Sequence, residues 1–435
     1  MREIYAQAAQ VARALTRPDL LARAALGFAG RTERSAPEAS SREILEEALA
    51  ALGDGYDGLR AKLLAYLAGT PPYHDSVETR SELSARSLEL ARRAGDPDAL
   101  YEALAARSFA LMGVDHVDER VRLADEMLEI SGQHADGVRT FLALEPRIRS
   151  LLTLGDIASA DRDIARYREL AERLHWPALQ FLGESYAAGR ALADGRYDDA
   201  EAHCGRQFEL GSTSQHPAGS GFLPWYCAWL ERERGGPVLR DLSDQIDPTA
   251  LSAIMSPSLE TCLTALGAFM NGERGNEDEA RRGLDRLSEQ AVLALPRDEH
   301  WITTMALLAD ATAQVRDEER AALFYDLLLP YAEQNLAHDL MRSYLGSTHH
   351  YLARLAACLD RFDQAETHYE AALRFNRHLG AAPLATRTQA AWGQWLRSRG
   401  LAKDRRRAGD LLEQAHATAV QLGMRDLARR TEDAE

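Results

Sequence analysis

The sequence contains little lysine and little cysteine, and both shortages exclude classes of function. Only Lys62 and Lys403 are lysine among 51 basic residues, and neither is followed by serine or threonine. No GxxxxGK[ST] phosphate loop is therefore present, which excludes a nucleotide site of the P-loop type. The four cysteines form no CxxC pair and show no metal-ligand spacing, so we expect a reducing compartment, no metal and no cofactor. They are Cys204, Cys227, Cys262 and Cys358.

The chain also lacks a basic excess and a long apolar run. Its 51 basic and 67 acidic residues give a formal net charge of −16, which argues against nucleic acid as a direct partner. The first residues, MREIYAQAAQ, carry charge where a signal peptide needs apolar residues. The longest uncharged stretch, residues 210–230, contains glycine, proline and serine and could not cross a bilayer as a regular helix. We therefore expect a cytoplasmic protein without a membrane partner.

Length and apolar content leave two architectures. The 435 residues are 46% hydrophobic, which excludes a disordered chain. A single globular core usually stops growing near ~250–300 residues. The chain is therefore either two or three domains, or one elongated repeat array whose core grows along an axis.

A repeat decides between these architectures. Gly155, Gly195, Gly235 and Gly275 are spaced by 40 residues, and each lies between a helix-like stretch and a charged segment. Glycine just past a helix can adopt positive φ and end it, so each period predicts a hairpin of two helices. An alanine follows most of these turns and would let the two helices approach closely. These alanines are Ala160, Ala200, Ala280, Ala321, Ala365 and Ala408.

Residues 1–435 are therefore predicted to form one all-α solenoid of about nine or ten helix pairs with a period of about 40 residues. We divide it into divergent N-terminal repeats (1–120), regular repeats (121–289) and C-terminal repeats (290–435). Prolines near helix starts give a second set of markers, and Asp96 is a predicted N-cap before Pro97. No sustained alternation of apolar and polar residues occurs, so almost no β-structure is expected.

The hairpin pattern resembles a tetratricopeptide repeat (TPR), which implies a right-handed superhelix. The residues that carry this resemblance are Leu352, Ala353, Phe362, Ala365, Tyr369 and Ala372. The period of 40 is longer than the ~34 residues usual for that repeat.

Most of the chain is similar to a narrower group, the helical-repeat sensor region of bacterial STAND-type ATPases. In that group the region follows an ATPase module and accompanies LuxR-type DNA-binding or nucleotide-cyclase parts. The resemblance implies either a piece of a larger regulator or a stand-alone descendant of one. The segments that carry it are RPDLLARAALGFAG (17–30), LPRDEHW (295–301), AALFYDLLLPYA (321–332), residues 343–381, and RRAGDLLEQAHATAVQLGM (406–424).

In hairpin solenoids the first helix of each pair lines the concave groove. The repeat register places Trp225 and Trp229 in that groove at i, i+4 spacing, with Phe222 one turn earlier. Such rings can stack on an extended peptide or a flat apolar ligand, or they can pack between helices. Polar residues on the same surface are also candidates, although each alone can equally be an ion pair or a solvated charge worth ~0–1 kcal/mol. They are Glu145, Arg149, Asp310, His350, Arg354 and Arg387.

Three functions fit these observations. The first is a non-catalytic binding domain, the sensor or scaffold of a signalling or transcriptional regulator, which takes a protein partner or small-molecule effector in its groove. The second is a stand-alone repeat-fold enzyme of specialised metabolism, for which Asp310 and His350 are the one acid/base pair we would name. The third is a self-associating scaffold, a homo-oligomer without a small ligand.

Overall fold

The computed structural model describes residues 2–30, 39–69, 76–133, 136–214, 223–235, 255–338 and 343–432. Within these residues the protein has 22 α-helices and one two-stranded sheet, so the predicted all-α fold class is confirmed. The chain divides into two compact units, residues 1–150 (unit 1) and residues 151–435 (unit 2). Among the described helices, we find none with both the length and the apolar character needed to cross a bilayer.

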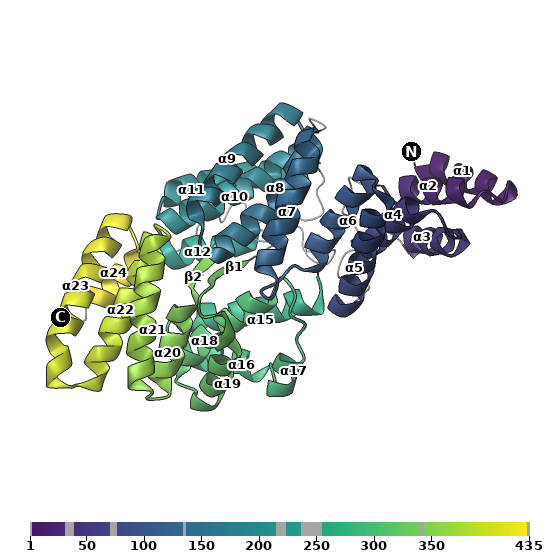
Figure 1. The fold of residues 1–435 in the computed structure, drawn as a ribbon. Helices are drawn as coiled ribbons and strands as arrows, with labels where there is room; N and C mark the ends of the chain where they lie inside the picture. Colours follow the sequence, from purple (N-terminus) through teal and green to yellow (C-terminus); the bar gives the residue numbers. More distant parts are fainter. Residues whose placement is uncertain are drawn as a thin grey trace. The chain divides into compact units, whose positions relative to one another are not determined.

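Unit 1 is formed by helices that pack mainly on their neighbours in the sequence (Figure 1). Its described helices are α1 (Arg2–Ala14), α2 (Pro18–Ala29), α3 (Ala39–Ala51), α4 (Asp57–Ala68), α5 (Val77–Ala94), α6 (Pro97–Ala110), α7 (Val117–Gln133) and α8 (Gly137–Leu154), whose last residues belong to unit 2. The start of α6 is as predicted: the Asp96 carboxylate accepts a hydrogen bond of 2.9 Å from the backbone N–H of Asp98, and Pro97 is the first helical residue.

Unit 2 contains helices on both sides of a short sheet. The elements before the sheet are α9 (Ile157–Leu174), α10 (Pro177–Asp194), α11 (Tyr197–Ser214), α12 (Leu223–Arg234), α15 (Pro257–Glu273), α16 (Glu277–Asp285), α17 (Glu289–Leu293), α18 (Trp301–Val315), α19 (Glu318–Leu328) and a 3-10 turn (Leu329–Tyr331). The sheet and the elements after it are β1 (Asn335–His338), β2 (Ser343–Ser347), α20 (Thr348–Cys358), α21 (Phe362–His378), α22 (Ala382–Arg399), a 3-10 turn (Ala402–Asp404), α23 (Arg405–Leu422) and α24 (Arg425–Glu432).

The turn glycines have the backbone conformation that the repeat predicted. Gly155, Gly195, Gly235 and Gly275 all have φ between +70° and +79°, a region in which an L side chain is strained. Gly195 closes α10, and α10 and α11 then pack together as a hairpin. The six alanines that follow the turns are buried, at 0–3% exposure, which is consistent with the small side chains expected where two helices pack together.

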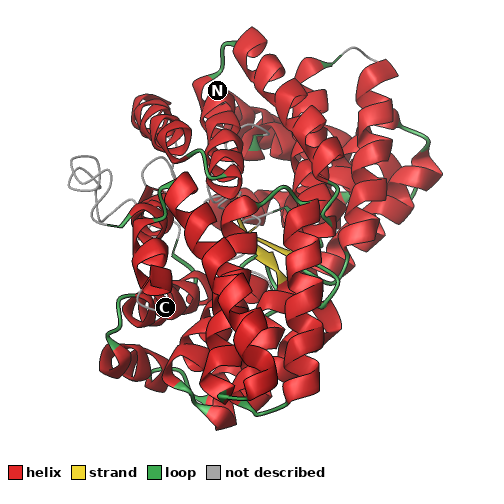
Figure 2. Ribbon diagram, turned by 90° about the vertical axis from the view of Figure 1, so that its left-hand side faces the viewer, coloured by secondary structure: helices red, strands yellow, loops and turns green. Residues whose placement is uncertain are grey.

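The β-hairpin was not predicted from the sequence. β1 and β2 are antiparallel and pair from Asn335–Ser347 to His338–Ser343, with an irregularity after Leu336. All four residues of β1 are buried, so neither face of the strand meets solvent and the strand shows no alternation of apolar and polar residues that would reveal it. Figure 2 shows the two strands surrounded by helices.

Polar side chains attach this hairpin to the helices of unit 2. The Asn335 amide donates to the backbone carbonyl of Leu152 on α8 at 2.9 Å. At the other end, the backbone N–H of Ser347 donates to the Asn376 side chain on α21 at 3.0 Å. The hairpin therefore joins the beginning of unit 2 to helices more than 180 residues later in the sequence.

Two stretches of unit 2 lie side by side. We call α9–α12 the early arm and α20–α24 the late arm. A Cβ added to Gly195 would lie 3.0 Å from Leu422 and 3.3 Å from Pro383, and one added to Gly235 would lie 3.1 Å from the Asp426 carboxylate. The turns of the early arm thus contact successive helices of the late arm, and α10 and α12 pack on α22 and α24.

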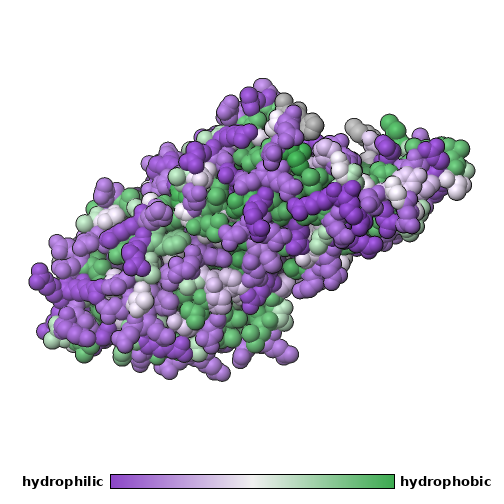
Figure 3. All heavy atoms as spheres, viewed as in Figure 1, coloured by the Kyte–Doolittle hydropathy of each residue, from purple (hydrophilic) through white to green (hydrophobic). Residues whose placement is uncertain are grey.

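Charged side chains are abundant on the surface and mostly form exposed pairs. On the face drawn in Figure 3, hydrophilic and apolar groups are interspersed. An example of such a pair is Arg173 with Glu169 at 3.9 Å, where both side chains are about two-thirds exposed. Exposed pairs of this kind contribute ~0–1 kcal/mol each. The charges that matter energetically are therefore those that folding has buried.

Candidate functional site

A buried group of charges lies between the early arm, the late arm and the helices α15 and α18. We call it the charged network. It includes three of the residues predicted from the sequence, Asp310, Arg354 and Arg387, and His350 lies beside it. Its members are Arg232, Glu233, Glu273, Asp310, Arg354, Arg387 and Arg430.

Arg387 is the central cation of the network. From α22 it donates to both carboxylate oxygens of Glu233 on α12, with Nε–Oε1 and Nη2–Oε2 distances of 3.0 Å. It also reaches the Glu273 carboxylate at 3.3 Å and the backbone carbonyl of Arg232 at 3.2 Å. Burial disfavours its charge, but Glu233 and Glu273 outweigh burial and raise the pKa of Arg387 above its ordinary value. The bidentate geometry suits a buried pair, because it satisfies several donors at once.

Glu273, the last residue of α15, collects cations from both arms. Arg232 of the early arm donates to it at 3.4 Å, and Arg430 of the late arm lies 3.6 Å from its carboxylate. Burial alone would raise the pKa of this carboxyl group. The nearby arginines Arg232, Arg387 and Arg430 more than offset burial and hold the pKa well below its usual range. Glu273 is therefore ionised at neutral pH although it is buried.

Asp310 and Arg354 form an ion pair between α18 and α20. The Asp310 side chain is 1% exposed and that of Arg354 is 20% exposed. Burial lowers the pKa of Arg354 below its ordinary value, and the Glu273 carboxylate opposes this shift. The pair is thus electrostatically linked to the rest of the network.

His350 lies in the same region of unit 2 but does not have the properties of a general base. Its Nδ1 is 3.1 Å from the Thr388 hydroxyl on α22, and only 8% of the residue is exposed. Burial, helped by Arg232 and Arg387, lowers the pKa of His350 to about 3. The imidazole is therefore neutral at physiological pH and a weak proton acceptor. Asp310, the other half of the predicted acid/base pair, is engaged by Arg354.

The two tryptophans predicted for the groove are buried among protein side chains. Trp225 is 2% exposed and packs edge-on against Trp229 and against His338, with ring centroids 5.6 Å and 4.9 Å away. Trp229 is 7% exposed and contacts Phe269, and the guanidinium of Arg232 lies 5.0 Å from its ring. The sequence allowed these two rings either to stack on a ligand or to pack between helices. In the described residues, both rings pack against protein side chains.

The remaining predicted residues lie elsewhere. Glu145 and Arg149 belong to unit 1, where both are buried and their side chains are 3.6 Å apart. Arg149 also lies 3.1 Å from the Met112 sulfur. Phe222 is outside the described residues.

A surface cavity of about 350 Å³ opens between α15 and α16, and it is lined by none of the predicted site residues. Its lining mixes apolar groups with Glu260, Glu279, Arg282 and Arg286. The cavity therefore has no contribution from the charged network.

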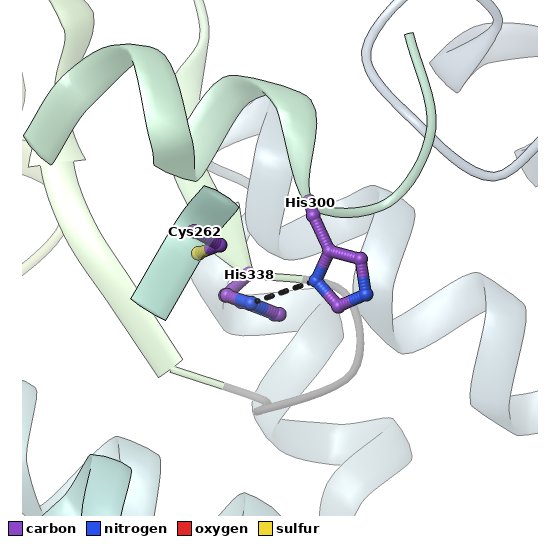
Figure 4. Close-up of side chains that lie close together, drawn as sticks. All are labelled: Cys262, His300 and His338. Atoms are coloured by element: carbon purple, nitrogen blue, oxygen red, sulfur yellow. Dashed lines mark hydrogen bonds between the residues drawn. The ribbon is translucent and has the colours of Figure 1, made fainter. Parts of the chain in front are cut away.

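A second buried cluster combines one cysteine with two histidines (Figure 4). Cys262 comes from α15, His300 precedes the first residue of α18, and His338 ends β1. One ligand atom from each lies within 4.8 Å of the others, and the residues are 1–3% exposed. Burial raises the pKa of the Cys262 thiol to about 12. Sequence reasoning predicted no metal site, because it considered only short spacings such as CxxC.

The charged network and the cluster of Cys262, His300 and His338 both contain residues that the repeat period could have indicated. Glu233 and Glu273 occupy the same position in successive repeats, two residues before Gly235 and Gly275. Cys262, His300 and His338 follow one another at intervals of 38 residues, close to one period. A search at the repeat spacing would have aligned these positions, although it could not have shown that they meet.

No model of a known protein family matches this sequence, and no curated protein is significantly similar to it.

Proposed function

We propose that the protein is a non-catalytic binding domain, a TPR-like solenoid that serves as the sensor or scaffold of a bacterial signalling or transcriptional regulator. The described hairpins would be turns of a right-handed superhelix with about nine or ten repeats. The resemblance to STAND-type sensor regions supports this assignment, and so do the turn glycines at 40-residue spacing with a common left-handed conformation. The protein would act in the cytoplasm.

The observation that carries the proposal is the charged network. Arg387 and Glu233 are 154 residues apart in sequence, and their contact joins the late arm to the early arm. Buried ion pairs add little net stability compared with apolar packing, but breaking one is costly. A contact of this kind suits a two-state element, because the arms are either joined with all charges paired or separated with all charges hydrated.

In this mechanism a protein partner or a small effector binds in the interior of the solenoid and competes for the charges of the network. Binding would change the separation of the arms, and an adjoining output module would respond to that change. The ligand can shift the equilibrium only by its difference in affinity for the joined and separated states. Charged or strongly polar ligands are expected, because an apolar ligand could not replace the partners of Arg387 and Glu273.

The test combines binding with a distance measurement. Spin labels at Arg206 on α11 and Arg406 on α23, both exposed, would report the arm separation by pulsed electron paramagnetic resonance. Native mass spectrometry of the full chain incubated with metabolite fractions and cellular proteins of the source organism would identify the ligand. We expect a bound species whose addition changes the distance distribution, and no chemical conversion of it.

Two results would contradict the proposal. Turnover of a metabolite by the purified chain would support the enzyme alternative. A concentration-dependent oligomer in light scattering, with no bound species and an unchanged arm distance, would support the self-associating scaffold.

A further inference from the structure

We propose that Cys262, His300 and His338 form a binding site for a transition-metal ion, with Zn²⁺ as the expected metal. The site shares no residue with the charged network, and it does not depend on the proposed function. It stands on the separations, the surroundings and the chemical nature of three side chains that come from three different elements.

The separations are close to those of a metal site. His300 Nδ1 and His338 Nε2 are 3.5 Å apart, which is long for a hydrogen bond between two ring nitrogens (Figure 4). Two nitrogens bound to one tetrahedral zinc at 2.0–2.1 Å would be ~3.4 Å apart. All three ligand atoms are within 4.8 Å of one another, so the widest separation needs to close by only roughly 1 Å to accept an ion.

The other side of the His300 ring faces a carboxylate. Its Nε2 lies 4.0 Å from the carboxylate of Glu299, on the ring edge away from His338. This distance is beyond hydrogen-bond range, but a movement of roughly 1 Å would let the carboxylate orient the imidazole in the way that outer partners orient ligating histidines. Asp298 accepts a hydrogen bond of 3.0 Å from the backbone N–H of His300 and so fixes the backbone that carries the ring.

The site is enclosed. His338 is held edge-on by the Trp225 ring, at a centroid distance of 4.9 Å, and both residues are at most 2% exposed. Glu299 and Asp298 are also buried, at 2% and 6% exposure. A divalent cation between the histidines and the thiolate would therefore lie beside two buried acidic residues.

The ligand types select the class of metal. Imidazole nitrogens and a thiolate suit borderline and soft ions, whereas Mg²⁺ and Ca²⁺ require oxygen ligands. Zn²⁺ has no geometric preference from its d-electrons and is commonly bound by mixed cysteine and histidine sets. Three protein ligands would leave one position of a tetrahedral ion for water.

A bound ion would fasten three separate parts of unit 2 to one another: α15, the start of α18 and the β-hairpin. The hairpin is otherwise held by hydrogen bonds such as Asn335 to Leu152 and Ser347 to Asn376. Metal loading should therefore slow hydrogen exchange at the amides of residues 335–338 and 343–347 more than elsewhere in unit 2.

The experiment uses the full chain without a polyhistidine tag, stripped with a chelator and titrated with Co²⁺ and then with Zn²⁺. We expect one Co²⁺ per chain with a thiolate-to-cobalt charge-transfer band and the visible bands of tetrahedral cobalt. Stoichiometric Zn²⁺ should abolish both sets of bands. X-ray absorption of the zinc-loaded wild-type chain should show one sulfur at ~2.3 Å and nitrogen ligands at ~2.0–2.1 Å.

Variants locate the site. Cys262→Ser should remove the charge-transfer band, whereas Cys358→Ser, at a half-buried cysteine on α20, should retain it. His338→Gln should weaken Zn²⁺ binding at least as much as the ~10–100-fold expected for Glu299→Gln, which removes an outer partner. Far-ultraviolet circular dichroism of each variant shows whether it is folded.

The X-ray absorption measurement needs no variant, so the proposal can be overturned even if Cys262→Ser does not fold. Absence of sulfur from the zinc shell would overturn it. So would a charge-transfer band that persists in folded Cys262→Ser, or the lack of any stoichiometric Co²⁺ or Zn²⁺ binding by the wild-type chain.

Discussion

Arg387 on α22 donates two hydrogen bonds of 3.0 Å to the carboxylate of Glu233 on α12, across 154 residues of sequence. This contact joins two arms that a regular solenoid would keep apart. It also explains why a buried carboxylate is present two residues before the turn at Gly235, where a surface charge would be expected.

Replacing Arg387 should destabilise unit 2 strongly. Arg387→Met removes the bidentate partner of the buried Glu233 carboxylate and one of the cations around Glu273, and a loss of ~3–5 kcal/mol in the free energy of unfolding is expected. All six tryptophans of the chain lie in unit 2, so urea unfolding followed by tryptophan fluorescence reports on this unit. The control is Arg173→Ala, at an exposed pair, which should change stability by less than ~0.5 kcal/mol. Equal effects of the two variants would argue against the role assigned to the network.

Acid should destabilise unit 2 through His350. Because burial lowers its folded-state pKa to about 3, the unfolded chain binds a proton below pH ~6.5 that the folded chain does not bind. Stability therefore falls as the pH drops from ~6.5 toward 3, by ~1.4 kcal/mol per pH unit for this group.

His350→Asn, which can retain a hydrogen bond to Thr388 but cannot titrate, should make the slope shallower between about pH 6.5 and pH 3. His368→Asn is the matched variant, since the pKa of His368 is also lowered, to about 4, mainly by burial and by His349. It should reduce the slope over a narrower range that ends near pH 4. A slope unchanged in both variants would contradict the assigned pKa values.

The contact between the arms can be tested at the turn glycines. Gly195 and Gly400 both have positive φ, so alanine at either position should cost ~1–2 kcal/mol from backbone strain. A Cβ at Gly195 would in addition lie 3.0 Å from Leu422, whereas one at Gly400 would meet nothing within 4 Å. Gly195→Ala should therefore be more destabilising than Gly400→Ala by ~1 kcal/mol or more in thermal unfolding. Identical melting temperatures would contradict the close approach of Leu422 and Pro383 to Gly195.

Truncating Trp225 should lower the stability of unit 2, because the ring packs inside the protein. Trp225→Ala removes a ring that is 2% exposed and packs on His338 and Trp229, and a loss of ~3–5 kcal/mol is expected. Trp176→Ala, at a partly exposed ring before α10, should cost clearly less. The comparison is made by circular dichroism at increasing temperature. A folded Trp225→Ala variant with wild-type stability but lost ligand binding would instead restore the groove interpretation.

The sequence by itself determined the helices and their turns. Local rules suffice there: glycine at Gly195 permits the left-handed residue that ends α10, and the Asp96 side chain caps α6. Alanines such as Ala200 lie at helix contacts because a small side chain permits close approach. These features depend on neighbours within a few residues or one repeat.

Only the tertiary structure decided which distant residues meet. Nothing local to Arg387 indicates Glu233, and nothing local to Cys262 indicates His338. Such pairs depend on how elements far apart in the sequence pack together in space, which no local pattern indicates. The β-hairpin was also beyond prediction, because a fully buried strand of four residues lacks the alternation that marks a strand. The repeat period could align the residues of both clusters, but only the fold brought them together.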